Sequence, residues 1–261
     1  MDFGIAGKTA LVLGGSGGLG RGIARALAAE GVRVAVAGRN PEAVEETCCQ
    51  VWDRDVRCLP LAWDLADPAQ IEPNITRIEQ ELGAVDILVN NTGGPPPTTA
   101  QGQDPALWTA QFQSMVLSVI AITDRVLPGM KAAGWGRIIT SASSGIEAPI
   151  PGLAISNALR ASLVGWSKTL SREVAPHGVT ANIIVPGRIA TDRIHFLDGK
   201  RAQAQGRTEA EVTAEATAAI PAGRMGTPEE YGAVVAFLAS QQAAYVTGSI
   251  VRVDGGLIPS I

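Results

Sequence analysis

Residues 11–20 read LVLGGSGGLG, where a short apolar run leads directly into a glycine-rich turn. Apolar residues then recur at helical spacing over residues 18–30, so the pattern predicts a strand, a tight turn and a helix in succession. Each glycine has a mechanical role in such a unit: Gly14 permits the turn, Gly18 lets the backbone approach a phosphate, and Gly20 permits close packing. The helix N-terminus adds N–H groups and a positive dipole end, which is typical of a phosphate-binding site.

Strand and helix patterns alternate along the rest of the chain. Six further apolar runs predict strands, at residues 32–37, 56–63, 85–90, 137–140, 180–185 and 249–253. Helical patterns separate most of them, starting at residue 41 and covering residues 68–82, 105–133, 156–174 and 228–239. Continuous apolar strands that alternate with helices are typical of a parallel sheet covered on both faces. We therefore expect an α/β fold of the doubly wound Rossmann type, with a single domain over residues 1–261.

The composition limits the classes of partner. Charged residues make up 18% of the chain and hydrophobic residues 46%, which we attribute to buried strands and to surface hidden in an oligomer. The net charge of -4 and the absence of a basic run argue against nucleic acid as a partner. We identify no apolar stretch long enough to span a bilayer and no signal peptide, so we expect no membrane partner.

Cysteine usage predicts neither a disulfide framework nor a metal site. The three cysteines are Cys48, Cys49 and Cys58, and no histidine is spaced to complete a metal site with them. We therefore interpret them as small apolar residues and expect no bound metal. Thiols that stay reduced fit a cytoplasmic location, which is the localisation that we expect.

Small and polar residues follow the carboxyl ends of several predicted strands. Ligands of open α/β sheets bind at this edge, so we expect these residues to surround a dinucleotide, with Asp64 and Leu65 near its adenine. The expected cofactor contacts are Gly14, Ser16, Gly17, Gly18, Leu19, Gly20, Arg39, Asn40, Asp64, Leu65, Asn91, Thr92, Gly93, Pro186, Gly187, Ile189 and Thr191.

The end of the second predicted strand bears on which nicotinamide cofactor is bound. A site for NAD usually has an acid here that bonds the ribose hydroxyl, but residues 37–40 read AGRN and contain none. Arg39 can instead pair with a 2′-phosphate through its planar fork of donors. We therefore favour NADP(H) over NAD(H) as the cofactor. The alternative is that Arg39 is a solvated loop charge.

Residues 188–224 interrupt the alternation with a polar, alanine-rich insertion. We expect one helix in it, around residues 208–220. Insertions at the carboxyl ends of strands often cover the ligand crevice, so this segment is expected to form a substrate lid. His195 lies in the insertion, and histidine suits proton transfer near neutral pH, although an exposed histidine without a role is the simpler interpretation. Glu147 is a weaker candidate for the same role.

With these motifs, the chain resembles the short-chain dehydrogenase/reductase family, in the branch that includes 3-oxoacyl-carrier-protein reductases. The glycine-rich turn matches the family's Gly-x3-Gly-x-Gly, residues 90–93 match its Asn-Asn-Ala-Gly with Thr for Ala, and residues 186–187 match its Pro-Gly. Residues 245–248 and 253–256 are similar to the family's last strand and subunit contact. The resemblance implies a seven-stranded parallel sheet in the order 3-2-1-4-5-6-7, a small-molecule substrate and a homotetramer, with a dimer as the alternative.

The chain departs from the family at the residues that move the proton. The resemblance implies that Ser143 binds the substrate oxygen, but Ser156 and Arg160 replace the family's Tyr-x3-Lys, and Met115 replaces its Asn. A serine hydroxyl is a weaker acid than a phenol and much shorter, and arginine stays protonated near neutral pH. The candidate catalytic residues are Ser143, Ser156 and Arg160, with Met115 inert. By the same resemblance, Arg160 is also expected to contact the cofactor ribose.

Three functions are compatible with this pattern. We favour an NADP(H)-dependent oxidoreductase that acts on a small carbonyl or alcohol by an atypical proton path, since neither Tyr231 nor Tyr245 is expected to replace the missing phenol. A catalytically impaired NADP(H)-binding sensor or partner subunit is the alternative. A non-redox enzyme is a third possibility, because halohydrin dehalogenases resemble this family and carry arginine at the lysine position. The intact glycine-rich turn counts against the third.

Overall fold

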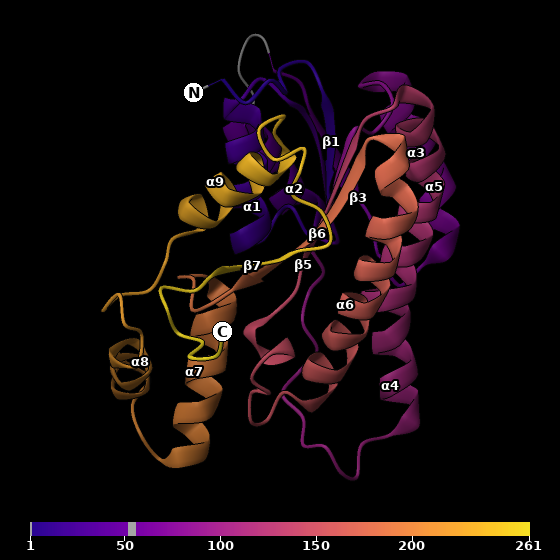
Figure 1. Cartoon of the computed structure of the whole chain (residues 1–261). Helices are drawn as coiled ribbons and strands as arrows, with labels where there is room; N and C mark the ends of the chain where they lie inside the picture. Colours follow the sequence, from indigo (N-terminus) through magenta and orange to yellow (C-terminus); the bar gives the residue numbers. More distant parts are fainter. Residues whose placement is uncertain (1, 52–55) are drawn as a thin grey trace.

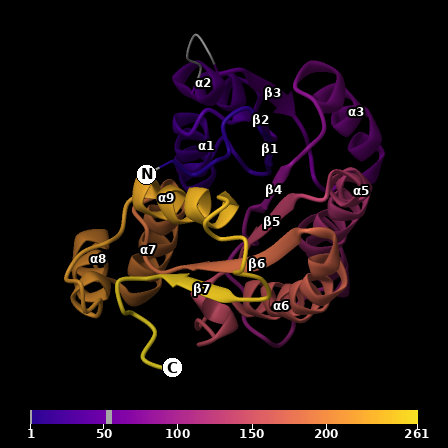
Figure 2. The same cartoon turned by 45° about the horizontal axis from the view of Figure 1, so that its top comes forward.

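The computed structural model describes residues 2–51 and 56–261. Within these residues, seven strands form one parallel sheet, as the sequence predicted (Figure 1). Their order is β3-β2-β1-β4-β5-β6-β7, which is the order that the resemblance implied (Figure 2). The strands are β1 (Thr9–Val12), β2 (Arg33–Gly38), β3 (Cys58–Ala62), β4 (Ile87–Asn90), β5 (Gly136–Ser141), β6 (Val179–Pro186) and β7 (Ile250–Val253). The strand order reverses between β1 and β4, next to the glycine-rich turn, which is the point where ligands bind in open α/β sheets.

Helices cover both faces of the sheet (Figure 2). One face packs on α1 (Gly18–Ala29), α2 (Pro41–Val51) and α9 (Pro228–Ala239). The other packs on α3 (Ile71–Glu81), α5 (Ser118–Ala133) and α6 (Ala154–Val174). Along β1, Ala10 and Val12 belong to the first core while Leu11 belongs to the second. Burial on both sides is the physical reason why the strands read as continuous apolar runs.

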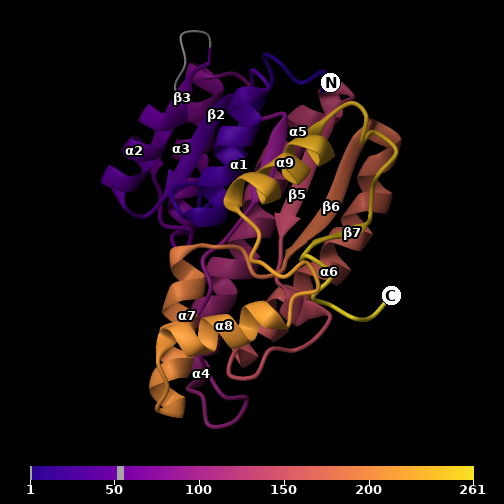
Figure 3. The ribbon, with the colours of Figure 1, turned by 90° about the vertical axis from the view of Figure 1, so that its left-hand side faces the viewer.

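The insertion between β6 and α9 forms a pair of helices, α7 (Asp192–Gln205) and α8 (Glu209–Ala218). The sequence predicted α8, which begins in a capping box between Thr208 and Glu211, but not α7. The α7 segment is polar and only weakly amphipathic, so its apolar periodicity is faint. Figure 3 shows this α7–α8 insertion (residues 188–224) projecting beyond the carboxyl ends of the strands.

We expected no apolar stretch long enough to span a bilayer, and this expectation was wrong. The helical run Pro105–Ala133 is long and apolar enough to cross a membrane, by length and composition only. It comprises α4 (Pro105–Phe112), a π-helical turn (Gln113–Leu117) and α5, with Pro128 inside α5. The most apolar stretch of this run is 33% buried within the chain, where α5 packs against the sheet. A helix that packs inside a domain or between subunits has the same composition as a membrane span, so this property does not by itself indicate a membrane.

The cysteines are also corrected, because the structure joins Cys48 on α2 to Cys58 on β3 in a disulfide. Their Cα atoms are 5.2 Å apart, and Cys49 is exposed and free. Spacing along the chain could not show that the end of α2 lies against the start of β3. The expectation of reduced thiols is therefore wrong for Cys48 and Cys58. The cysteines no longer argue for a cytoplasmic location.

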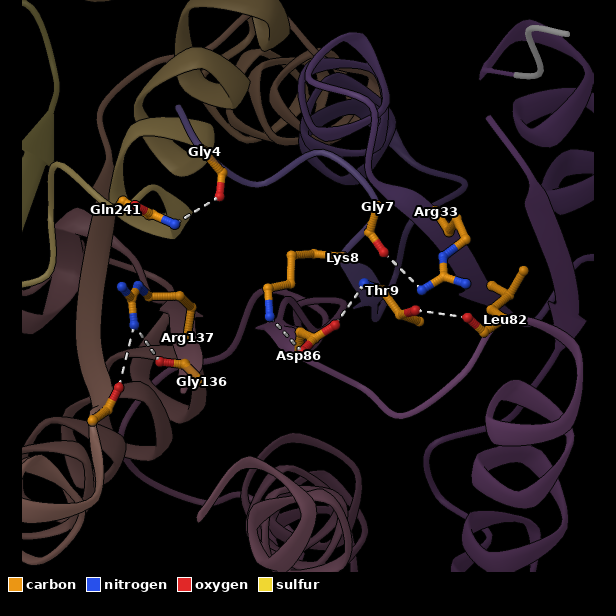
Figure 4. A network of polar contacts seen from close by, with 11 residues as sticks. Gly4, Gly7, Lys8, Thr9, Arg33, Leu82, Asp86, Gly136, Arg137 and Gln241 are labelled. Carbon is orange, nitrogen blue, oxygen red and sulfur yellow. Dashed lines mark hydrogen bonds and ion pairs between the residues drawn. The ribbon is translucent and has the colours of Figure 1, made fainter. Parts of the chain in front are cut away.

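A network of polar contacts closes the amino-terminal edge of the sheet (Figure 4). The Lys8 ammonium lies 3.2 Å from a carboxylate oxygen of Asp86, whose other oxygen accepts a hydrogen bond from the Thr9 N–H at 3.0 Å. The buried Arg137 donates to the carbonyl of Gly136 at 2.9 Å. These contacts satisfy polar groups at this edge. Ligands of open α/β sheets bind at the opposite, carboxyl-terminal edge.

Candidate functional site

The glycine-rich turn has the geometry that its sequence predicted. Gly14 has a φ of 57°, in the left-handed region that favours glycine. A β-carbon on Gly20 would lie 2.1 Å from the carbonyl oxygen of Gly14, so only glycine allows α1 to pack this closely on the turn. A β-carbon on Gly18 would lie 2.4 Å from the Thr191 methyl carbon, which places the start of the α7–α8 insertion directly over the turn.

The N-terminus of α1 has no side-chain cap. Its N-cap, Gly17, has no side chain to accept from the first turn, and this turn contains no acidic residue. The free N–H groups and the helix dipole therefore favour an anion here. Asn91 holds the neighbouring end of β4 against the turn, because its side-chain amide donates to the carbonyls of Leu13 at 3.2 Å and Gly14 at 3.3 Å.

The end of β2 presents Arg39 and Asn40 to solvent. The Asn40 side chain accepts from the N–H of Ala43 at 3.1 Å and starts α2, whereas Arg39 forms no ion pair among the described residues. A β-carbon on Gly38 would lie 2.4 Å from the Ser16 hydroxyl, so the glycine-rich turn and the end of β2 are in contact. These residues together form a polar corner with a free guanidinium and no acid.

The other expected cofactor residues line the same edge. Asp64 and Leu65 follow β3, Thr92 and Gly93 follow β4, and the segment after β6 holds the rest, namely Pro186, Gly187, Ile189 and Thr191. Pro186 pairs with Val253 of β7, which fixes where this segment leaves the sheet. Because β3, β2, β1, β4, β5 and β6 are successive neighbours, their carboxyl ends bring these residues into one row.

Ser143 and Ser156 lie near the end of β5 in different surroundings. The Ser143 oxygen accepts from the N–H of Gly145 at 3.2 Å, which leaves its hydroxyl proton free to donate to a ligand. Ser156, in the first turns of α6, is only 6% exposed. Met115 lies in the π-helical turn and is 2% exposed, so it offers packing and no proton.

Arg160 is directed into the protein. It is 7% exposed, and its guanidinium donates to three carbonyl oxygens, those of Ser141 at 3.1 Å, Thr92 at 3.0 Å and Gly93 at 3.3 Å. It therefore joins the carboxyl ends of β4 and β5. Burial lowers its pKa to about 10, while Tyr231 acts to raise this value and Arg193 to lower it. The side chain remains a cation at neutral pH.

Tyr231 lies closer to the site than its place in the sequence indicated. It is fully buried on α9, and its hydroxyl lies 2.9 Å from that of Ser141, whose carbonyl accepts from Arg160. Burial raises the pKa of Tyr231 well above its ordinary value, with Ser141 and Arg160 acting in the opposite sense. Since the phenol is enclosed by the core, it has no path to a ligand at this edge.

Arg193 is a site residue that the sequence interpretation missed. Its guanidinium donates to the carbonyl of Pro95 at 2.7 Å, and a β-carbon on Gly94 would lie 2.9 Å from the same nitrogen. The α7–α8 insertion thus touches the loop after β4. The sequence shows an arginine two residues after Thr191. Its contact with Pro95 could not be predicted, because Pro95 is 98 residues away and no local pattern relates the two residues.

The two other proton donors considered from the sequence have partners elsewhere. The His195 side chain is 60% exposed and its Nδ1 lies 3.2 Å from the Glu209 carboxylate, between α7 and α8. The Glu147 carboxylate pairs with Arg252 of β7. Among the residues the structure describes, no group of three or more potential metal ligands is present.

Comparison with known proteins gives matches over nearly the whole chain. A family model described as enoyl-(acyl carrier protein) reductase matches residues 14–258. The 3-oxoacyl-[acyl-carrier-protein] reductase FabG of Escherichia coli is 37% identical over 252 residues, 96% of this chain and 97% of the relative. The NADPH-dependent reductase BacG of Bacillus subtilis is 31% identical over 256 residues, 97% of this chain and 99% of the relative.

The fold matches solved structures equally fully. The L-sorbose reductase from Gluconobacter frateurii, solved in complex with NADPH and L-sorbose, superposes with a TM-score of 0.94 at 30% identity and covers 100% of both chains. The carboxyl-terminal edge of the sheet therefore superposes on the carboxyl-terminal edge of the sheet in that enzyme.

Proposed function

Since the chain belongs to the short-chain dehydrogenase/reductase family, in the branch similar to 3-oxoacyl-acyl-carrier-protein reductases, we propose that it is an NADP(H)-dependent oxidoreductase. Its substrate would be a small carbonyl compound or the corresponding alcohol. The observation that carries the proposal is the intact dinucleotide edge, where the Gly14 turn and the uncapped N-terminus of α1 leave room and N–H donors for a diphosphate.

The residues present fit NADP(H) better than NAD(H). Arg39 is exposed and has no ion-pair partner in the part of the chain that the structure describes, and residues 37–40 contain no acid, so it suits the 2′-phosphate. Ser16 would support the same phosphate, and Asp64 and Leu65 would border the adenine. The residues at 91–93 and 186–191 would surround the nicotinamide half. This preference agrees with one relative that is named as an NADPH-dependent reductase and with a similar enzyme that was solved in complex with NADPH. When bound, the cofactor supplies or accepts the hydride.

The proton path would differ from the family's. We assign the Ser143 hydroxyl to the substrate oxygen, since its proton has no acceptor among the residues that the structure describes. Ser156 is too short to take the place of a phenol, and Arg160 is held by carbonyls. The remaining donor is water at the Ser143–Ser156 edge. Loss of one general acid costs ~10²–10⁴-fold in rate, so an activated carbonyl is the substrate class that this site would turn over best.

A second candidate function has a specific observation in its favour. Because Ser156, Arg160 and Met115 replace the family's proton-handling residues while the cofactor edge is intact, the chain could bind NADP(H) as a sensor or as a partner subunit. A non-redox enzyme fits less well, since the glycine-rich turn keeps its dinucleotide geometry.

Turnover separates these functions. Purified protein would be incubated with NADPH and a panel of aldehydes, 1,2-diketones and 3-oxo esters, with absorbance at 340 nm followed over hours. Oxidation that depends on one substrate class and is lost in a Gly14→Val variant supports the oxidoreductase. NADPH binding without oxidation of any substrate supports the sensor, and product release from a halogenated alcohol without cofactor would support the non-redox enzyme.

We also propose that the protein assembles as a homotetramer, with a dimer as the alternative. Phe112 and Leu117 are exposed on the α4–α5 run, as is Ile250 on the edge strand β7, and apolar side chains in these places suit subunit contacts. Light scattering after gel filtration measures the mass directly. A monomer at micromolar concentration would contradict the proposal.

A further inference from the structure

Two guanidinium groups converge on one short loop at the site. Arg160, from α6, donates to the carbonyls of Thr92 and Gly93, and Arg193, from α7, donates to the carbonyl of Pro95. The loop of residues 92–95 follows β4 at the edge where the cofactor would bind. Two positive charges from different elements therefore face the same small region of the site.

Neither of these charges has an acidic partner among the described residues. The other arginines of the α7–α8 insertion do: Arg188 pairs with Asp198 at 2.5 Å, Arg201 and Arg207 pair with Glu215, and Arg224 pairs with Glu230. Arg193 instead meets only a carbonyl and the ring of Phe196, 5.6 Å from its guanidinium carbon. An unpaired and partly buried cation is costly unless a ligand completes it.

The guanidinium of Arg193 keeps donors available for such a ligand. One of its terminal nitrogens is used by Pro95, and Gly94, which has no side chain, lets the group lie flat against the loop. Its other N–H groups have no acceptor in the described part of the chain. A planar fork with free donors, fixed at one end, matches the two oxygens of a carboxylate.

We propose that the site takes substrates whose carboxylate is bonded to the reacting carbonyl carbon or separated from it by one carbon atom, and that Arg193 binds this carboxylate. The inference rests on the proposed function and names its substrate class, an oxo acid. The positive charge of Arg160 would also attract the carboxylate electrostatically. Arg160 would not touch the substrate, since all of its assigned hydrogen bonds are to main-chain carbonyls.

The cofactor diphosphate is the other anion that could reach this region. Thr191 lies against Gly18, at the N-terminus of α1 where the diphosphate would bind. Arg193 lies instead against Gly94 and bonds the carbonyl of Pro95, in the loop that follows Asn91. Its contacts are thus with the loop after β4 and not with the glycine-rich turn, which favours the substrate as the source of the anion, and affinity for NADP⁺ distinguishes the two sources.

The test is calorimetric and needs no turnover. Acetoacetate, 2-oxobutanoate and the methyl ester of each would be titrated into protein saturated with NADP⁺, for the wild type, Arg193→Met and Arg201→Met. Arg201 is a matched control, because it lies on the same helix and loses the same charge but pairs with Glu215 at the surface. Affinity for NADP⁺ would be measured first for every protein.

We expect one acid to bind the wild type at least about tenfold more tightly than its ester, because the ester cannot form the charge-assisted pair with the guanidinium. This preference should disappear in Arg193→Met and persist in Arg201→Met, with NADP⁺ affinity unchanged. Equal binding of acids and esters, or no binding of any of the four, would overturn the inference. So would a loss of NADP⁺ affinity in Arg193→Met as large as the loss for the acid, which would assign the arginine to the diphosphate.

Failure of the proposed function has a different signature. If the wild type does not bind NADP⁺ at all, the cofactor site is disproved before any acid is added. If NADP⁺ binds and the acids show no preference, only the substrate class is wrong.

Discussion

The guanidinium of Arg160 and the carbonyl oxygen of Ser141 are 3.1 Å apart, so an α6 side chain is bonded to the last residue of β5. The same guanidinium also bonds the loop after β4. The family's lysine at this position is one of its acid–base residues, whereas arginine here ties two neighbouring strand ends together. Arg160, whose replacement of the lysine argues for a loss of catalytic activity, thus has a structural role.

Replacing Arg160 should therefore weaken the fold. In Arg160→Met, three carbonyl oxygens lose their donor, and we expect the free energy of unfolding to fall by about 2 kcal/mol. Urea denaturation followed by tryptophan fluorescence measures this. The control Arg201→Met removes an exposed ion pair and should change stability by less than about 0.5 kcal/mol. Unchanged or greater stability in Arg160→Met would show that the carbonyl bonds contribute nothing.

Close packing of α1 on the glycine-rich turn gives a second prediction. A β-carbon on Gly20 would meet the backbone oxygen of Gly14 at 2.1 Å, so Gly20→Ala should cost about 1–3 kcal/mol and weaken cofactor binding. Gly129, inside α5, has nothing within 4 Å of a β-carbon, so Gly129→Ala should raise stability by about 0.5–1 kcal/mol. Thermal unfolding with and without NADPH checks both. Equal effects of the two variants would contradict the packing described here.

The buried phenol gives a prediction at alkaline pH. Burial raises the pKa of Tyr231 above the value of about 10 found in unfolded chains. The folded state therefore holds this proton longer, so its contribution to stability is complete below pH ~10 and is lost as the pH rises further. Tyr245 is the only other tyrosine. In Tyr245→Phe, absorbance at 295 nm should rise only when the protein unfolds, as followed by circular dichroism. Ionisation in the folded protein would show that the phenol is accessible.

The thiols can be counted directly. With Cys48 and Cys58 joined, denatured protein should react with Ellman's reagent at one thiol per chain, Cys49, and at three after reduction. A Cys49→Ser variant serves as the control and should show none before reduction. Three reactive thiols without reductant would mean that the pair is not bonded in the purified protein.

Much of the fold follows from local patterns. Strands buried on both faces are apolar along their length. Gly14 and Gly20 are required by close backbone contacts, and Gly18 by the close approach of the Thr191 side chain. Both features can therefore be predicted from the sequence. The α7 helix cannot be predicted from the sequence pattern, because it packs against the rest of the domain through few apolar residues. The bond between Cys48 and Cys58 and the π-helical turn at Met115 also depend on packing between elements.

The site is predictable in part for the same reason. The spacing of Ser156 and Arg160 places them on one helix face, but spacing does not say that Arg160 turns toward the carbonyls of the neighbouring strand ends. The contact of Arg193 with Pro95 forms only when the α7–α8 insertion folds against the loop after β4. Positions along the strand ends can be deduced from topology, whereas side-chain directions across elements cannot.

Titration of NADPH and NADH by fluorescence tests the central claim, the dinucleotide site with its preference for NADP(H). We expect NADPH to bind, and Arg39→Ala to weaken it about tenfold or more with NADH binding unchanged, because the lost pair is charge-assisted. Arg172→Ala, an exposed arginine on α6 away from this edge, should leave NADPH affinity as it is. No binding of either cofactor at high micromolar concentration, or an equal loss of both in Arg39→Ala, would contradict the account.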